Sequence, residues 1–435
     1  MQNLKKIPVL PKGLVFSFVL VTTLFALWGF ANDISNPMVA AFRRILLISH
    51  FESSLVQFAF YAGYCFMAIP AAIFIQRFNY KNGILMGLAL YSLGCFLFIP
   101  AGNIMAFWAF LMAYFVMTCG LAFLETTANP YILSMGPEET STRRLNFAQA
   151  FNPIGSLTGM LIARQFILAR LHSIDEIDRA TLKTNSPEIF LYVQQSDLDT
   201  VSLPYLMLGG VVLVFFIVFL FAKLPQSQST NFGDMQLAKT FKRLISNAVY
   251  IRGVLAQAFY VGVQIMVWTF IIQYADIELN MPYADAQSYN MLAMGIFVTS
   301  RFICTFLLKY IKPSSLLLYL AVGGAAFTLG TIILKGMAGL YCLIAISACM
   351  SLMFPTIYGI ALKGLGDDAK LGSAGLILAI GGGMLLPPLQ GLLIDKSTWF
   401  TWLSSIRFSF VLSLFCFIFI AMYGRWVQKY RGEQT

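Results

Sequence analysis

Long apolar segments separated by short polar connections run through the sequence from end to end. A helix of about 20 apolar residues can cross the hydrocarbon core of a bilayer, whereas the strands of a transmembrane barrel give short segments of alternating polarity. The pattern therefore predicts an all-α integral membrane protein with twelve spanning helices. These are expected at about residues 14–42, 54–76, 82–101, 104–134, 145–168, 203–223, 250–275, 286–309, 315–335, 338–362, 372–394 and 404–426.

Two polar connections are longer than the rest. Residues 169–202 carry several acidic side chains and are expected to form an external loop, and residues 225–249 form a polar cytoplasmic linker. The linker divides the chain into two six-helix halves, residues 1–224 and 250–435, which show weak internal similarity. Transporters are commonly built from such paired halves, with the substrate site between them near the membrane midplane.

The distribution of Lys and Arg predicts the orientation of the chain. Segments on the side of the N-terminus hold 19 of these residues, and the opposite side holds 9. Cytoplasmic loops carry the excess of basic residues. Both termini are therefore expected in the cytoplasm.

Composition excludes several classes of function. Charged residues make up 11% of the chain, against about 25% in soluble domains. The seven cysteines lie in apolar segments and the two histidines are far apart, so no metal site or cofactor is expected. No G-x-x-x-x-G-K-[ST] motif occurs, which argues against ATP as the energy source. The net charge of +10 is scattered over short loops and does not indicate a nucleic-acid partner.

Two acidic side chains, Asp33 and Glu125, fall well inside predicted spans. An ionisable group in hydrocarbon costs about 2.5–3.5 kcal/mol even on insertion scales, so it usually has a function. Asn129 lies one turn after Glu125, and Asn32 and Asn36 accompany Asp33, on faces that neighbouring turns share. Two acids at different depths suit proton transfer across the membrane. The simpler alternatives are a solvated Asp33 near the external interface and a Glu125 bonded to a neighbouring helix.

Three amides open the fifth predicted span. Asn146, Gln149 and Asn152 recur at every third residue and are expected to share one helical stripe. With Glu125 and Asn129 of the fourth span, they predict the wall of a polar pocket between neighbouring membrane helices.

The seventh predicted span carries amides and aromatic rings together. Gln257, Tyr260, Gln264 and Trp268 recur at offsets of 3, 7 and 11 residues and so lie on one helical face. Aromatic rings can stack on a sugar, and amides can pair with its hydroxyls. The alternative is ordinary helix packing with amide contacts. Arg301, a cation deep in the next span, is expected to have a structural role.

Five motifs, spread over both halves, resemble the fucose–proton symporter family of the major facilitator superfamily. They are Leu27–Asp33 (LWGFAND), Leu124–Pro130 (LETTANP), Arg144–Asn152 (RLNFAQAFN), Ala256–Gln264 (AQAFYVGVQ) and Phe354–Ile357 (FPTI). The resemblance implies two six-helix halves around a central cavity, in an inner-membrane sugar importer that alternates access. It also implies that Glu125 is the acid of the fourth span and that Gln149 and Asn152 contact the sugar.

One position departs from the family pattern. The family usually has its first-span acid where this chain has Asn36, whereas the acid here is Asp33, one turn earlier on the same face. Either Asp33 has taken over this proton role, or proton coupling depends on Glu125 alone.

We therefore predict a proton-coupled symporter that imports L-fucose or a similar monosaccharide through a bacterial inner membrane, as a monomer in the lipid bilayer. The expected proton-coupling residues are Asp33 and Glu125, and the expected substrate-binding residues are Asn32, Asn36, Asn129, Gln149, Asn152, Tyr260, Gln264 and Trp268. A glucose or galactose transporter of the same family and an uncoupled sugar facilitator are the nearest alternatives. An intramembrane protease would need a second catalytic Asp or a His within the spans, and a sugar sensor would need an added cytoplasmic domain.

Overall fold

The computed structural model describes residues 10–136, 144, 147–174, 176–224, 237–308, 310–365, 368–396 and 403–430. Every regular element in these ranges is a helix, as the hydrophobic pattern predicts. Within them, eleven helical segments are long and apolar enough to cross a membrane.

The first half consists of the helices up to residue 221. They are η1 (Lys12–Leu14), α1 (Val15–Ser35), α2 (Met38–Leu46), α3 (His50–Phe78), α4 (Tyr80–Phe96), α5 (Phe98–Ile104), α6 (Phe107–Ser134), α8 (Asn152–Ile162), the π-helical η3 (Ala163–Leu168), α9 (Glu176–Asn185) and α10 (Pro187–Phe221).

The second half consists of the helices from residue 237 onwards. They are α11 (Leu237–Ser246), α12 (Ala248–Leu279), α13 (Tyr283–Leu307), α14 (Pro313–Ile333), α15 (Gly336–Met350), α16 (Met353–Leu362), α17 (Ala369–Leu378), η5 (Ala379–Gly381), α18 (Gly382–Lys396), α19 (Ser405–Ser409) and α20 (Val411–Tyr430).

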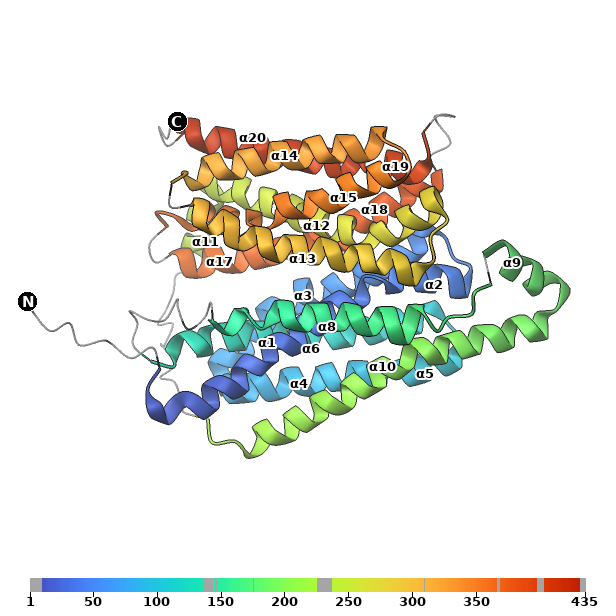
Figure 1. Ribbon diagram of the computed structural model, residues 1–435. Coiled ribbons are helices and arrows are strands. Elements are labelled where there is room, and N and C mark those ends of the chain that lie inside the picture. The colour runs from blue at the N-terminus through green and yellow to red at the C-terminus, as the bar shows by residue number, and fades with distance from the viewer. Residues whose placement is uncertain are drawn as a thin grey trace, which may run out of the picture.

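The two halves lie one above the other in Figure 1, with their long helices running roughly along the same direction. Helix α1 begins and α20 ends at the same end of the bundle. We call this the terminal end and the other the distal end. Helix α3 of the first half packs along α18 of the second. The exact limits of the first half (residues 1–224), the linker (225–249) and the second half (250–435) stay a prediction.

Local sequence signals explain several helix boundaries. Ser49 and Glu52 form a capping box at the start of α3, in which each side chain accepts a hydrogen bond from the other residue's backbone N–H, an arrangement that satisfies donors left free at a helix start. Proline opens α10 and α14 at Pro187 and Pro313, where its missing N–H costs no helical bond. The predicted break at Pro37 lies between α1 and α2.

The fifth predicted span, residues 145–168, is less regular than expected. Residues 145 and 146 lie outside the described residues. Helix α8 has 11 residues and continues into the six-residue η3, while residues 150–151 form a turn before it. This interruption explains why the span is not one of the eleven long apolar helices.

The prediction of an external loop at residues 169–202 is wrong for most of its length. Residues 176–185 form α9, and the first 16 residues of α10 occupy 187–202. This part of α10 buries one face, which carries both apolar and polar side chains, among them Val193, Gln194 and Asp197. Its acidic residues suggested a loop, yet they lie on a helix that extends beyond the span. The linker likewise contains the amphipathic α11, whereas residues 225–236 lie outside the described residues.

Helices α1 and α8 touch backbone to backbone. A methyl group added at Gly29 would collide with the carbonyl oxygen of Asn152, and one added at Gly155 would collide with the carbonyl oxygen of Ala26. Small residues allow this approach in membrane helices. The contact fixes the polar end of α1 against α8.

A buried ion pair joins α9 to α10. Arg179 Nη2 lies 2.5 Å from Asp197 Oδ2, and both side chains are fully buried. Asp197 Oδ1 accepts from the backbone N–H of His172, and Arg179 donates to the carbonyls of His172 and Ile174. The pair therefore anchors the chain between η3 and α9 to α10.

We predict that Arg179→Met destabilises the protein by about 3–5 kcal/mol, because it leaves the Asp197 carboxylate buried without its partner. Thermal unfolding in detergent would measure this as a lower Tm. The control is Lys183→Met, which removes an exposed cation from the same helix. Equal shifts in Tm for the two variants would contradict a stabilising role for the pair.

Candidate functional site

Asp33 lies near the end of α1 and is 2% exposed. Its Oδ1 accepts a hydrogen bond of 3.0 Å from Nδ2 of Asn36. Ser156 of α8 and Asn32 lie within hydrogen-bonding reach of the same carboxyl. No basic side chain in the described part of the chain forms an ion pair with it. The carboxyl is thus surrounded by neutral polar groups, and the solvated alternative for Asp33 does not fit this burial.

Asn36 connects three helices. Its Oδ1 accepts from Gln57 Nε2 of α3 at 3.1 Å and from Thr269 Oγ1 of α12 at 3.4 Å, while its Nδ2 donates to Asp33. Asn36 and the two donors are fully buried. The amide is therefore occupied by protein partners, and one of them belongs to the second half.

Two tyrosines of α3 lie between the two acids. Tyr61 donates to Asn32 Oδ1 at 3.2 Å and interacts electrostatically with Asp33. Tyr64 stacks on Tyr61 with ring centroids 6.3 Å apart and interacts electrostatically with Glu125. Tyr64 is 4% exposed. The two rings therefore connect the surroundings of Asp33 with those of Glu125.

Glu125 lies on α6 and is half-buried. Its Oε2 is buried and has no hydrogen-bond partner among the described residues. Asn129, one turn later, donates to the Glu125 carbonyl at 3.0 Å and accepts from Gln149 Nε2 at 3.2 Å. The structure thus brings Glu125, Asn129 and Gln149 together. A hydroxyl or water entering here would find an unpaired carboxyl oxygen.

The three amides of the fifth span do not form the continuous stripe that their spacing predicts. Gln149 is exposed and bonded to α6, whereas Asn152 is half-buried and its Nδ2 donates to the Phe25 carbonyl of α1 at 3.4 Å. The turn at residues 150–151 interrupts the helix between them. Asn146 lies outside the described residues. The two described amides therefore contact different helices.

The polar atoms of the seventh-span aromatics are bonded within the second half. Tyr260 donates to the Met350 carbonyl at 3.0 Å, and Trp268 Nε1 donates to Ser347 Oγ at 3.2 Å. Both rings are buried, whereas Gln264 is half-buried. Their arrangement fits a packed wall, in which Gln264 is the most accessible of the three. Arg301 donates to the Ser351 carbonyl at 3.1 Å, which agrees with the expected structural role.

The two halves are bonded to each other at the distal end. The Asp395 carboxylate of α18 accepts from the backbone N–H groups of His50 and Phe51 at 3.0 and 2.8 Å, at the first turn of α3. The N-terminus of a helix favours a negative charge, because its first N–H groups are free to donate. His50 Nδ1 also lies 2.8 Å from Gln273 Oε1 of α12. The halves are therefore closed at this end.

Sequence reasoning missed the polar residues that α3 contributes. Gln57, Tyr61 and Tyr64 follow His50 by 7, 11 and 14 residues, a spacing that places them on one helical face. This polar stripe in an apolar helix was the available signal. Thr269 had no comparable signal, because a single threonine in a membrane helix usually bonds to its own backbone.

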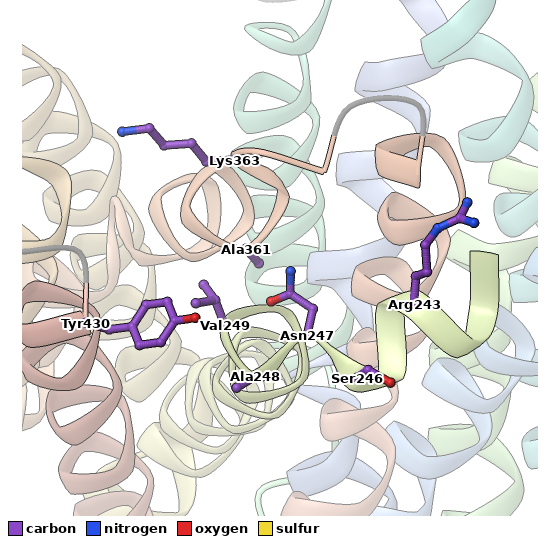
Figure 2. A pocket seen from close by; sticks show the side chains of 8 residues that line it. All are labelled: Arg243, Ser246, Asn247, Ala248, Val249, Ala361, Lys363 and Tyr430. Carbon is purple, nitrogen blue, oxygen red and sulfur yellow. The ribbon is translucent and has the colours of Figure 1, made fainter. Parts of the chain in front are cut away.

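Two cavities lie away from these residues. One of about 610 Å³ is lined by Arg243, Asn247, Lys363 and Tyr430, among others. Figure 2 shows the charged end of Arg243 turned away from the other lining residues. It bonds to Asp368, which lowers the pKa of that carboxyl. The other cavity, of about 470 Å³ between α1, α8 and α10, is almost wholly apolar. Neither cavity is lined by a predicted site residue.

No group of three or more His, Cys, Asp or Glu side chains in the described ranges could hold a metal ion.

Comparisons with known proteins agree with this fold. The family model of the Major Facilitator Superfamily matches residues 19–381. The chain is 52% identical to an L-fucose–proton symporter of Haemophilus influenzae over 96% of this chain and 97% of that protein. It is 30% identical to a glucose/galactose transporter of Brucella abortus over 95% and 94% of the two chains.

A solved structure shows the same architecture. The crystal structure of FucP, a Major Facilitator Superfamily transporter in the outward conformation, superposes with a TM-score of 0.71 at 32% identity, covering 96% of this chain and 99% of that one. The family match, the identity over nearly the whole chain and this superposition agree. The chain belongs to the Major Facilitator Superfamily and, within it, to the fucose–proton symporter family.

Proposed function

We propose that the protein is a proton-coupled symporter that moves L-fucose or a similar monosaccharide by alternating access. The main support is that two acids, Asp33 and Glu125, lie inside a chain that is 52% identical to an L-fucose–proton symporter over nearly its whole length. Neither acid forms an ion pair with another described residue. The chain is a transporter and not an enzyme. Buried acids in membrane helices serve as proton carriers when neutral partners surround them.

The proposed roles follow from the partners of each residue. Asp33 and Glu125 carry protons, because both carboxyls lie among neutral groups. The sugar contacts proposed are Asn32, Asn129, Gln149, Asn152 and Gln264, with Tyr260 and Trp268 forming the wall behind them. Amides offer both a donor and an acceptor, which matches the hydroxyls of a sugar. Asn36, expected to bind substrate, is better explained by a positioning role.

The proposed setting is a bacterial inner membrane, with both termini in the cytoplasm and the chain acting as a monomer in the lipid bilayer. The eleven long apolar helices support a multi-pass protein, and the excess of Lys and Arg on the terminal side supports this orientation. The distal end then faces the outside. The two halves, residues 1–224 and 250–435, move relative to each other about the site between them.

A second candidate is a transporter of glucose or galactose. It is favoured by the 30% identity to the Brucella abortus glucose/galactose transporter. The two candidates differ only in which hydroxyl configuration the amides accept, and an uncoupled facilitator differs from both in its response to a pH gradient.

We predict that the purified protein in liposomes accumulates L-fucose above the external concentration when the outside is acidic. Labelled L-fucose, glucose and galactose should be compared with and without the pH gradient. Preferential uptake of glucose or galactose would favour the second candidate, and uptake that ignores the gradient would favour a facilitator.

We predict that Glu125→Gln retains sugar binding and loses accumulation driven by the pH gradient. Gln keeps the size and hydrogen-bonding capacity of Glu and removes the titratable group. Calorimetric measurement of sugar binding and gradient-driven uptake separate the two effects. Glu52→Gln, at the exposed start of α3, is the matched control. Accumulation at the normal rate by Glu125→Gln would contradict the proposed role.

We predict that Asp33→Asn abolishes coupled accumulation and that adding Asn36→Asp restores part of it. The two side chains are bonded to each other at 3.0 Å, so the exchange keeps one carboxyl and one amide in contact. Gradient-driven uptake and the pH change on adding sugar to a weakly buffered protein solution measure the effect. Intact signals in Asp33→Asn would leave Glu125 as the proton carrier.

A further inference from the structure

An apolar crevice opens on the surface of the first half. It has a volume of about 470 Å³ and lies between α1, α8 with η3, and α10. Four of the side chains that line it, Ile154, Phe166, Met207 and Val211, are also exposed. The crevice is therefore open to the surroundings of the bundle, and in a membrane these surroundings are lipid.

The course of two irregular helices leaves this space open. Pro204 stands inside α10, and α8 continues into the π-helical η3. A proline inside a helix removes a hydrogen bond and bends the helix. Helix α10 packs along α4 and runs at an angle to α8 in Figure 1, so that α8 and α10 separate towards the terminal end. The crevice thus follows from the backbone of the first half.

The inside of the crevice offers no free hydroxyl to water or to a sugar. The hydroxyls of Thr23 and Thr158, which line it, donate to the carbonyls of Leu20 and Ile154 in their own helices at 2.7 and 2.8 Å. Water enters a cavity only where polar partners can bind it, and an empty space loses the dispersion contacts of its lining. A hydrocarbon chain is the occupant that this lining favours.

The crevice has about the length of one leaflet of a bilayer. Its α10 wall reaches from Leu203, towards the distal end, to Phe215. These residues are twelve positions apart, which is about 18 Å along a helix. Half of the hydrocarbon core of a bilayer is about 15 Å thick. One acyl chain of the leaflet at the distal end can therefore lie along the crevice.

A cation stands at the distal end of the crevice. Arg170 lines it, is exposed, and has its guanidinium carbon 4.9 Å from the ring centroid of Phe166. None of the ion pairs among the described residues involves Arg170. A guanidinium matches two oxygens of a phosphate with parallel hydrogen bonds. A phospholipid carries its phosphate where its acyl chains begin, so Arg170 stands where that phosphate is expected.

We propose that the crevice binds a phospholipid of the leaflet at the distal end, with one acyl chain between α8 and α10 and the phosphate on Arg170. Ala26 and Gly155, whose backbones touch, both line the crevice. The bound chain therefore also covers the contact that holds α1 against α8. The site involves neither the sugar nor the proton, so it does not rest on the proposed function.

The experiment uses phosphatidylglycerol with a diazirine near the end of one acyl chain, in phosphatidylcholine nanodiscs that contain the full chain. After illumination, peptide mass spectrometry locates the lipid adducts. They should concentrate at Ile154, Val211 and Phe215 in the crevice. Val214, an exposed residue of α10 outside the crevice, is the reference for ordinary lipid contact. A diacylglycerol with the same chains and no phosphate should give about two- to fivefold fewer crevice adducts, the effect of one exposed ion pair.

Two variants change the two ends of the site separately. Thr158→Phe fills the crevice with a ring and should remove most crevice adducts of both lipids, whereas Leu220→Phe, at an exposed position of α10 outside the crevice, should leave them unchanged. Arg170→Gln should abolish the preference for phosphatidylglycerol over diacylglycerol. Lys335→Gln, which removes an exposed cation between α14 and α15, should retain it. Thr158→Leu replaces Thr158→Phe if the latter does not fold.

Three results would overturn the proposal. Equal numbers of adducts in the crevice and at Val214 would make the crevice ordinary lipid-facing surface. Equal labelling of the parent protein by the two lipids would remove Arg170 from the site. A crevice without adducts would be empty or covered by a second copy of the chain. Sugar uptake enters none of these measurements, so the proposed function is tested separately by gradient-driven accumulation.

Discussion

The structure depends on the need to keep the carboxyl groups of Asp33 and Glu125 inside an apolar bundle, where no described cation pairs with either of them. A buried charge without a partner is costly, and polar neighbours that hydrogen-bond to it reduce this cost. The neighbours of Asp33 come from its own helix and from α8, and Asn36 extends the set to α3 and α12. Four helices from distant parts of the sequence must therefore meet at one place. The close contact of α1 with α8 through Gly29 and Gly155 serves this convergence.

The break in α1 has the same physical origin. Pro37 has no N–H, so the carbonyl of Asp33 loses its normal helical donor. Such a defect is tolerated in a membrane helix only where neighbouring polar groups compensate for it. It also separates α1 from α2, so that Asn36 stands at the junction with its side chain bonded to three residues. The proline and the buried polar cluster therefore depend on each other.

The sequence was sufficient to predict the helical class, most of the spans and the position of Asp33 and Glu125 inside helices, because hydrophobic length and a charge in an apolar segment are local signals. It could not predict that Thr269 bonds to Asn36, since 233 positions separate them and neither periodicity nor composition links them. The prediction of a loop at 169–202 is wrong because α10 extends past the expected span. Its acidic residues are paired or exposed on this helix and do not mark a loop. The predicted stripe of Gln149 and Asn152 on one helical face is not formed, because residues 150 and 151 form a turn between them.

Among the described residues, closure of the distal end uses several modest interactions and no fully buried ion pair between the halves. Asp395 accepts from two backbone N–H groups of α3, His50 contacts Gln273, and Thr269 contacts Asn36. A neutral hydrogen bond contributes about 0.5–1.5 kcal/mol net and one to a charged group about 1.5–3 kcal/mol, so this set is worth several kcal/mol. Binding of a small sugar and a proton can reverse an equilibrium of this size. A buried ion pair leaves an uncompensated buried charge when it is broken, at a cost of about 3–5 kcal/mol. Neutral amides and a helix terminus avoid this cost, so they suit a contact that must open in every cycle.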